Sequence, residues 1–180
     1  MLKQKAKVIW FTGYSGSGKT TLASALEQQL FERGYFCQVL DGDNVRSGIN
    51  NNLGFSEADR LENIRRIAEV CKLFLNSGII TICAFISPTH EIRNLARTII
   101  GDEDFLEIWV STPLEICEQR DTKGLYAKAR KGLIKDFTGI NAPFEEPQNA
   151  LLAIDTANTP LNSSLQTLLS VLEPKIKPTK

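Results

Sequence analysis

The chain has 180 residues, about the size of one ordinary domain, so we expect a single domain over residues 1–180. The sequence contains 21 Lys and Arg residues and 21 Asp and Glu residues, and this zero net charge gives no global field that would favour nucleic acid or an anionic membrane as a partner. Residues 1–7 are basic but lack an apolar signal core, no apolar run is long enough to span a bilayer, and the four cysteines stand singly, so we expect a cytoplasmic protein with reduced thiols.

The first predicted element is a strand that leads directly into a glycine-rich loop. Residues 7–12 form an apolar run, residues 13–20 read GYSGSGKT, and residues 19–33 have a helical pattern. Glycines in the loop let backbone N–H groups wrap around phosphate oxygens, and the helix N-terminus points its positive dipole end at the same charge. The pattern predicts a phosphate-binding P-loop; the alternative is a flexible turn.

This loop also predicts the cofactors. Lys19 would neutralise the β- and γ-phosphates of ATP, and Thr20 would offer its hydroxyl to a Mg²⁺ ion that bridges them. We therefore expect ATP and Mg²⁺ as cofactors. The residues expected to hold the nucleotide are Gly13, Tyr14, Ser15, Gly16, Ser17, Gly18, Lys19, Thr20 and Thr21.

The second predicted strand, residues 36–40, ends in two acids, Asp41 and Asp43. Ligands of an open parallel sheet bind beyond the carboxyl ends of its strands, so both carboxylates are expected near the nucleotide. Asp43 would accept the proton of an attacking hydroxyl, and Asp41 would help to order the waters of the metal. The alternative is a purely structural role, in which Asp43 caps the short turn that follows.

A long helix is predicted over residues 57–76, with Ser56 and Asp59 at its N-terminal cap. Arg60 and Asn63 lie three residues apart and share one face of this helix. Together with Arg46 from the preceding loop, they could receive a second anionic group. Phe55, just before the helix, is either a hydrophobic anchor or a stacking surface for a base.

The remaining strands are predicted at residues 79–86, 105–110 and 151–154, and the remaining helices at residues 88–100, 113–120 and 160–172. Alternating strands and helices are typical of an α/β fold, here a five-stranded parallel sheet flanked by helices. The third strand ends in Ser87, where many P-loop proteins place an Asp that holds the metal.

One long segment, residues 121–149, interrupts this alternation. It is rich in glycine, proline and charged residues and has no sustained apolar period. A segment of this kind inside one domain is usually functional, and we predict a lid. The alternative, a disordered insertion, is less favoured because the segment contains apolar anchors such as Leu125, Tyr126 and Phe137.

Several blocks of the chain form a combined pattern. They are GYSGSGKTT at 13–21, LDGDNVR at 40–46, LGFS at 53–56, ENIRR at 62–66, AFISP at 84–88, CEQRD at 117–121, KGLY at 123–126 and FTGI at 137–140. Together they resemble the adenylyl-sulfate kinase family, P-loop kinases that use ATP to phosphorylate the ribose 3′-hydroxyl of adenosine 5′-phosphosulfate in sulfate assimilation. The resemblance extends from residue 13 to about residue 156.

This resemblance implies roles for residues of the acceptor site. The adenine of adenylyl sulfate would lie between Phe55 and Phe137, and Lys123 would belong to the lid. Homodimers are common in the family and are expected here. The resemblance marks Ser87 as a catalytic position, in some descriptions a phosphoserine intermediate, although nothing near it in the sequence supplies a base. The residues expected to contact the phosphosulfate are Arg46, Arg60 and Asn63, with backbone contacts from Ile86 and Ser87.

The chain also departs from the family pattern. Ser47 replaces a usual His, and Thr89 and His90 replace an aromatic residue and an Arg, which could alter the affinity for the acceptor. Another small-metabolite or nucleotide kinase, a nucleotide-dependent switch and a decayed paralogue are the rival interpretations. The sequence lacks the Asn-Lys-x-Asp segment by which GTPase switches read guanine, and the expected catalytic positions are intact.

Overall fold

The computed structural model describes residues 2–178 and contains a five-stranded sheet in the order β2-β3-β1-β4-β5. All paired strands are parallel, as the alternating sequence pattern predicts. The strands are β1 (Val8–Thr12), β2 (Cys37–Asp41), β3 (Ile80–Ala84), β4 (Phe105–Val110) and β5 (Leu152–Ile154).

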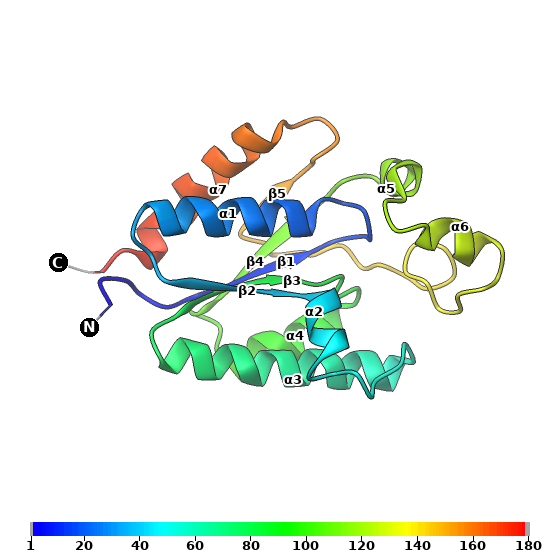
Figure 1. Cartoon of the computed structure of the whole chain (residues 1–180), viewed down its shortest axis with the longest axis horizontal. Coiled ribbons are helices and arrows are strands. Elements are labelled where there is room, and N and C mark those ends of the chain that lie inside the picture. The colour runs from blue at the N-terminus through cyan, green and yellow to red at the C-terminus, as the bar shows by residue number, and fades with distance from the viewer. Residues whose placement is uncertain (1, 179–180) are drawn as a thin grey trace.

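Helices cover both faces of the sheet, with α1 and α7 on one side and α3 and α4 on the other (Figure 1). The helices are α1 (Lys19–Glu32), α2 (Gly42–Ser47), α3 (Glu57–Asn76), α4 (His90–Ile100), α5 (Leu114–Arg120), α6 (Leu125–Arg130) and α7 (Leu161–Ile176). Both ends of the described chain lie at the edge of the molecule opposite α5 and α6 (Figure 1). The α/β fold predicted from the sequence is therefore confirmed.

The central strand β1 divides the core into two clusters. Its side chains alternate between faces, so Ile9 and Phe11 pack under α1 and α7, whereas Val8 and Trp10 pack against α3 and α4. All four are fully buried, as expected for a parallel strand that is covered on both sides. This rigid centre holds the P-loop, which follows β1 directly.

A third, smaller cluster lies beyond the carboxyl ends of the strands. It contains Cys117 of α5 together with Tyr126, Ala129 and Phe137 of the segment 121–149. This segment is less irregular than predicted, because α6 lies within it. The carboxylate of Asp121 accepts hydrogen bonds from the backbone N–H groups of Tyr126 and Ala127, both at 3.0 Å, and so caps α6.

The predicted helix ends agree with the structure in one case and differ from it in two. Ser56 caps α3 by accepting a hydrogen bond of 3.2 Å from the backbone N–H of Asp59. The alternative role for Asp43 as a cap is wrong: Asp41 is the N-cap of α2 and accepts a 2.9 Å hydrogen bond from the backbone N–H of Asp43. Helix α7 also continues past its predicted end to Ile176, which is fully buried.

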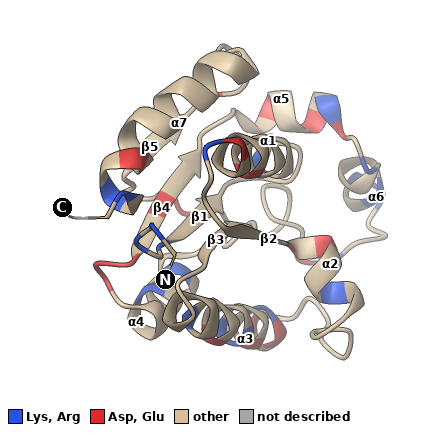
Figure 2. Cartoon of the chain, turned by 60° about the vertical axis from the view of Figure 1, so that its left-hand side comes forward, with Lys and Arg blue, Asp and Glu red and all other residues tan. Residues whose placement is uncertain are grey.

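Charged residues of both signs are distributed over the helices, and they alternate along α3 in Figure 2. Within residues 2–178, no helix is long and apolar enough to cross a membrane. The four cysteines all lie in this part of the chain as free thiols.

Candidate active site

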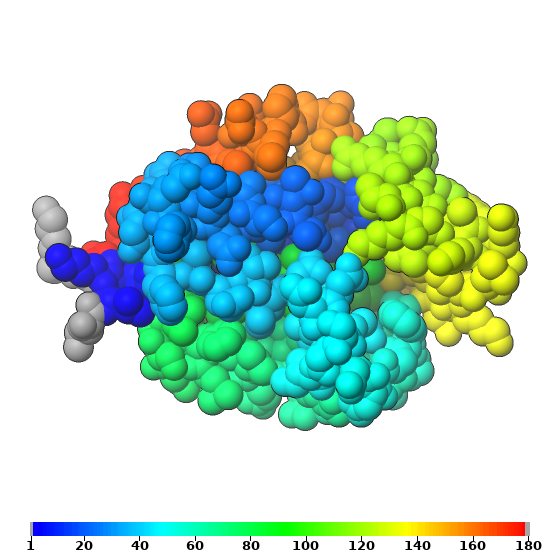
Figure 3. Space-filling view, in the orientation of Figure 1, coloured from blue at the N-terminus to red at the C-terminus, as the bar shows by residue number. Residues whose placement is uncertain are grey.

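A cleft of about 760 Å³ opens beyond the carboxyl ends of the strands. In Figure 3 the cyan surface of α2 and its following loop lies opposite the yellow-green surface of α5 and α6, with the molecule hollowed between them. The predicted site residues that line this cleft are Ser15, Gly16, Gly18, Lys19, Thr20, Thr21, Asp41, Asp43, Arg46, Phe55, Arg60, Asn63, Ile86, Ser87, Lys123 and Phe137. Gly13, Tyr14 and Ser17 belong to the same loop but do not line the cleft.

The backbone of the P-loop needs glycine at two tight positions. Gly13 has φ of 146° and Gly16 has φ of 74°, in the region that other residues rarely adopt. A Cβ atom at Gly13 would lie 2.6 Å from the carbonyl oxygen of Val110, and one at Gly16 would lie 2.9 Å from that of Cys117. Helix α1 starts immediately after this loop, at Lys19. The loop therefore has the curvature and the helix N-terminus that phosphate binding requires.

Lys19 is held under this loop. Its Nζ donates hydrogen bonds to the carbonyl oxygens of Gly13, at 3.0 Å, and Tyr14, at 2.6 Å. The residue is 8% exposed, and burial lowers the pKa of its ammonium group to about 8, although the nearby carboxylate of Asp41 opposes this shift. A phosphate group bound at the loop would supply a negative charge beside this buried ammonium.

The lowered pKa predicts a pH-dependent stability for the nucleotide-free protein. Lys19 binds its proton more weakly in the folded chain than in the unfolded chain, so stability rises as pH increases from about 8 to 10.5. The free energy of unfolding of the native protein, minus that of Lys19→Met, should grow by up to about 3 kcal/mol across this range. Urea titrations of both proteins at several pH values measure it; a constant or shrinking difference would contradict the prediction.

A hydroxyl and a carboxylate meet where the metal is expected. The Oγ1 of Thr20 donates a 2.7 Å hydrogen bond to Oδ2 of Asp41. These are oxygen donors of the kind that Mg²⁺ accepts, directly or through its waters, when phosphate oxygens supply the remaining ligands. Among residues 2–178 there is no cluster of three or more His, Cys, Asp and Glu side chains that could hold a metal. The Thr20–Asp41 pair fits a magnesium ion that arrives with the nucleotide.

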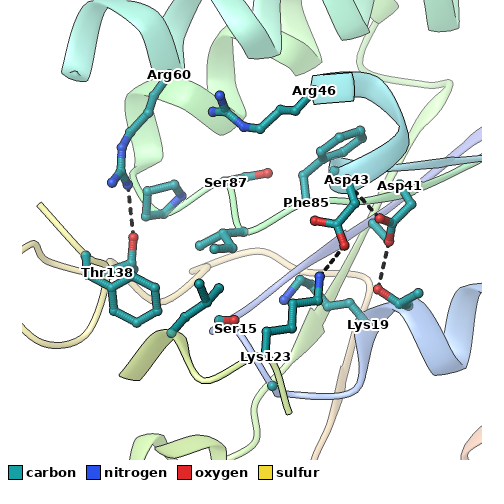
Figure 4. Close-up of a pocket in the computed structure, with 18 of the residues that line it drawn as sticks. Ser15, Lys19, Asp41, Asp43, Arg46, Arg60, Phe85, Ser87, Lys123 and Thr138 are labelled. Carbon is teal, nitrogen blue, oxygen red and sulfur yellow. Dashed lines mark hydrogen bonds and ion pairs between the residues drawn. The ribbon is translucent and has the colours of Figure 1, made fainter. Parts of the chain in front are cut away.

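Asp43 projects into the cleft from the first turn of α2. Its carboxylate forms an ion pair with the ammonium group of Lys123, which comes from the opposite wall (Figure 4). The Asp43 side chain is 73% exposed, so it remains accessible to a substrate. The carboxylate and the ammonium of Lys19 lie at the same end of the cleft (Figure 4).

Two arginines form the other end of the cleft. Arg60 donates to Oγ1 of Thr138 at 3.0 Å and to the carbonyl oxygen of Asp136, whereas Arg46 donates to the carbonyl oxygen of Gly54 at 2.9 Å. Burial lowers the pKa of both guanidinium groups, and the charge of Arg60 lowers that of Arg46 further. Two half-buried cations that repel each other are well placed to receive an anion.

Two phenylalanines stand near these arginines. Phe55 is 60% exposed. Its ring lies under the guanidinium of Arg46, with the Cζ atom of Arg46 4.4 Å from the ring centroid. Phe137 is 8% exposed, and its ring meets that of Tyr126 edge-on. Both line the cleft. Phe55 does not belong to any of the three core clusters, which favours a stacking surface over a hydrophobic anchor.

Ser87 is 3% exposed and has a strained backbone, with φ of 43°. Its Oγ accepts a 2.9 Å hydrogen bond from Nε1 of Trp10, a group that cannot take up a proton. Its carbonyl oxygen accepts a 2.8 Å hydrogen bond from Arg93. The residue is thus held as part of the backbone that lines the cleft.

The residues that depart from the family pattern have local partners. Ser47 donates a 2.9 Å hydrogen bond to the carbonyl oxygen of Asn44, and Thr89 caps α4. His90 begins that helix, with Nδ1 3.0 Å from a guanidinium nitrogen of Arg93. None of these three residues lines the cleft, so none takes over the position of Arg46 or Arg60.

Sequence reasoning missed three residues of the site. Thr138 receives the hydrogen bond from Arg60. Arg120 donates to the carbonyl oxygen of Thr156 at 2.9 Å and lines a second hollow, of about 200 Å³, beside Gly18. Tyr126 donates to the carbonyl oxygen of Ser15. All three residues stand in blocks of the family pattern, but the sequence does not show their hydrogen-bond partners, which depend on the fold.

Known proteins share both the sequence and the fold. The family model described as adenylylsulphate kinase matches residues 5–155. The adenylyl-sulfate kinase of Bacteroides thetaiotaomicron is 65% identical over 177 residues, covering 98% of this chain and 88% of that protein. The structure of the Mycobacterium tuberculosis APS kinase CysC in complex with AMPPNP and APS superposes with a TM-score of 0.90 at 46% identity, covering 94% of this chain and 98% of that one. The hexameric APS kinase from Thiobacillus denitrificans superposes with a TM-score of 0.72 at 32% identity, covering 96% of this chain and 30% of that one.

Proposed function

The chain belongs to the adenylylsulphate kinase family, and we propose that the cleft described above is the active site for its reaction. The reaction is the ATP-dependent phosphorylation of the 3′-hydroxyl of adenylyl sulfate, which gives 3′-phosphoadenylyl sulfate for sulfate assimilation. One observation carries the assignment of the site: a single cleft contains the P-loop, two half-buried arginines that could bind an anion (Arg46 and Arg60) and the exposed carboxylate of Asp43.

The donor half of the site is the P-loop. Backbone N–H groups of residues 13–20 bind the β- and γ-phosphates of ATP, and Lys19 exchanges its carbonyl partners for phosphate oxygens. Thr20 and Asp41 would hold Mg²⁺, directly or through water, and the bound metal would neutralise charge on the phosphates. The adenine of ATP would lie in the second hollow, beside Gly18 and Arg120, because this hollow adjoins the P-loop.

The acceptor half of the site lies across the cleft. Arg46, Arg60 and Asn63 bind the phosphosulfate, and the adenine lies between the rings of Phe55 and Phe137. Asn63 is buried, with its Oδ1 accepting a 2.9 Å hydrogen bond from Asn50, which fixes its orientation. The shape and charge of this half explain why a nucleotide with an anionic substituent is the acceptor.

Phosphoryl transfer between the two halves is direct and in line. Asp43 accepts the proton of the 3′-hydroxyl as its oxygen attacks the γ-phosphorus, and Lys19 stabilises the charge on the transferring group. A covalent relay through Ser87 is not needed, since the indole N–H that binds its hydroxyl cannot activate it. Ser87 and Ile86 instead contribute backbone contacts to the acceptor.

The experiment that tests this function compares acceptors under saturating MgATP. Adenylyl sulfate, AMP and a sugar acid such as gluconate are offered separately, and ADP release is followed. Saturable turnover with adenylyl sulfate, at least about 100-fold more efficient than with AMP, is expected because AMP lacks the sulfate that the arginines bind. Preferred turnover of AMP or gluconate would instead support the rival interpretation of another small-metabolite kinase.

We propose that residues 121–149 form a lid that closes over both substrates, held by the ion pair of Lys123 with Asp43 and the hydrogen bond of Thr138 with Arg60. Deleting residues 123–139 should lower transfer to adenylyl sulfate by about 100-fold or more, since the groups of the acceptor site are no longer positioned. The ratio of ATP hydrolysed to product formed should rise, because water is no longer excluded.

The milder variant Thr138→Val removes only the hydroxyl that Arg60 binds. It should raise the same hydrolysis ratio by a smaller factor, with Thr167→Val on the outer surface of α7 as the matched control. Unchanged transfer and an unchanged ratio in both the deletion and Thr138→Val would refute the lid.

The assembly and compartment are part of the proposal. Self-association within the family is indicated by the Thiobacillus denitrificans relative, which is described as hexameric, and we propose a homodimer for this chain. Four free thiols suit the reducing cytoplasm. Analytical ultracentrifugation tests the dimer as a doubling of the 20.0 kDa chain mass.

A further inference from the structure

Tyr126 contacts both halves of the cleft from behind. It is 1% exposed, and its hydroxyl donates a 2.9 Å hydrogen bond to the carbonyl oxygen of Ser15 in the P-loop. Its ring packs edge-on against Phe137, with 5.0 Å between the ring centroids and 81° between their planes. Ser15 and Phe137 each line the cleft, on the donor and acceptor sides. One side chain therefore joins a wall of one subsite to a wall of the other.

The position of Tyr126 is fixed by its surroundings. Asp121 binds the backbone N–H of Tyr126 at 3.0 Å and so holds the start of α6. The ring belongs to the third core cluster, with Cys117, Ala129 and Phe137. Burial raises the pKa of the Tyr126 hydroxyl, so it stays protonated and keeps donating to the carbonyl. Tyr126 is thus a packed, oriented side chain in contact with both Ser15 and Phe137.

We propose that Tyr126 is a positioning residue that couples the binding of ATP to the binding of adenylyl sulfate. When phosphates bind the P-loop and fix its backbone, the Ser15 carbonyl holds the Tyr126 hydroxyl, and the ring of Tyr126 sets Phe137 in place for the acceptor base. Because linkage is reciprocal, adenylyl sulfate must favour ATP by the same factor. This inference rests on the proposed function of the cleft.

The size of the coupling follows from the contact. A neutral hydrogen bond between buried groups changes an equilibrium by about two- to tenfold. Tyr126→Phe removes this bond and keeps the ring that packs on Phe137. The variant should therefore lose two- to tenfold in coupling, while its affinity for the ATP analogue AMPPNP alone changes less than about twofold.

Isothermal titration calorimetry measures the coupling directly. The dissociation constant of adenylyl sulfate is determined with and without saturating Mg²⁺ and AMPPNP. The coupling factor is the constant measured without the nucleotide divided by the constant measured with it. The ratio should exceed one in the native protein and fall in Tyr126→Phe. The matched control Tyr35→Phe makes the same chemical change in a residue that packs against the first core cluster, and its ratio should equal that of the native protein.

Two outcomes would overturn the proposal. One is a ratio of one in the native protein. The other is an unchanged ratio in Tyr126→Phe, as when adenylyl sulfate affinity falls equally with and without AMPPNP, which a merely structural role would give. The first is decisive whether or not the variant folds. The proposed function fails in a different way, since the native protein would then not phosphorylate adenylyl sulfate at all.

Discussion

Asp43→Asn is expected to lower kcat for the phosphorylation of adenylyl sulfate by about 10²- to 10⁴-fold, the usual contribution of a positioned general base. The amide retains the size of the side chain but cannot accept the proton of the 3′-hydroxyl. The fold should survive, because the backbone N–H of Asp43, and not its carboxylate, takes part in capping α2. The KM for ATP should change little. A coupled assay of ADP release measures both constants.

The control for this variant is Lys123→Ala, which breaks the same ion pair but leaves the carboxylate in place. If Asp43 acts as the base, Lys123→Ala should retain much more kcat than Asp43→Asn. Near-normal turnover in Asp43→Asn, or equal losses in the two variants, would mean that the carboxylate serves only to hold the lid.

Lys19→Met should lower kcat by about 10²- to 10³-fold, comparable to the loss of one preorganised donor that stabilises charge in a transition state. The ammonium is buried beneath the loop, where it donates to the carbonyl groups of Gly13 and Tyr14, and it exchanges these partners for phosphate oxygens when ATP binds. Steady-state kinetics with saturating MgATP and adenylyl sulfate measure the effect.

Lys72→Met is the matched control for Lys19→Met, since Lys72 lies exposed on α3. It should leave kcat within about twofold of the native value, as expected for an exposed charge away from the site. If Lys19→Met raised only the KM for ATP and left kcat unchanged, the ammonium would contribute to ground-state binding and not to phosphoryl transfer.

The parts of the site that sequence could predict are those in which one short segment contains both the chemistry and its geometry. The P-loop is the clearest case, because its glycines, Lys19 and the start of α1 occupy consecutive positions. The carboxyl ends of β2 and β3 were also predictable, since parallel strands bring Asp41 and Ser87 to the same edge of the sheet. Roles for these residues stay predictions until the variants are measured.

The parts that sequence could not predict depend on contacts between distant segments. Helix α6 has only six residues, and its stability comes from the Asp121 cap and from packing of Tyr126 and Ala129 in the third cluster, not from an apolar period. A cap role for Asp43 was open as an alternative because either acid suits that role; the extended backbone of Asp41 makes Asp41 the N-cap of α2. The link from Tyr126 to Ser15 spans 111 residues and has no local signal.

The most direct test of the account is the identity of the product. The protein is incubated with MgATP and adenylyl sulfate, and the new nucleotide is analysed by mass spectrometry and ³¹P NMR beside a control that contains AMP in place of adenylyl sulfate. We expect one added phosphate on the ribose 3′-oxygen with the phosphosulfate intact, and one ADP released for each product. Phosphate on another atom, or ADP released without a phosphorylated acceptor, would contradict the central claim that the cleft places the 3′-hydroxyl of adenylyl sulfate against ATP.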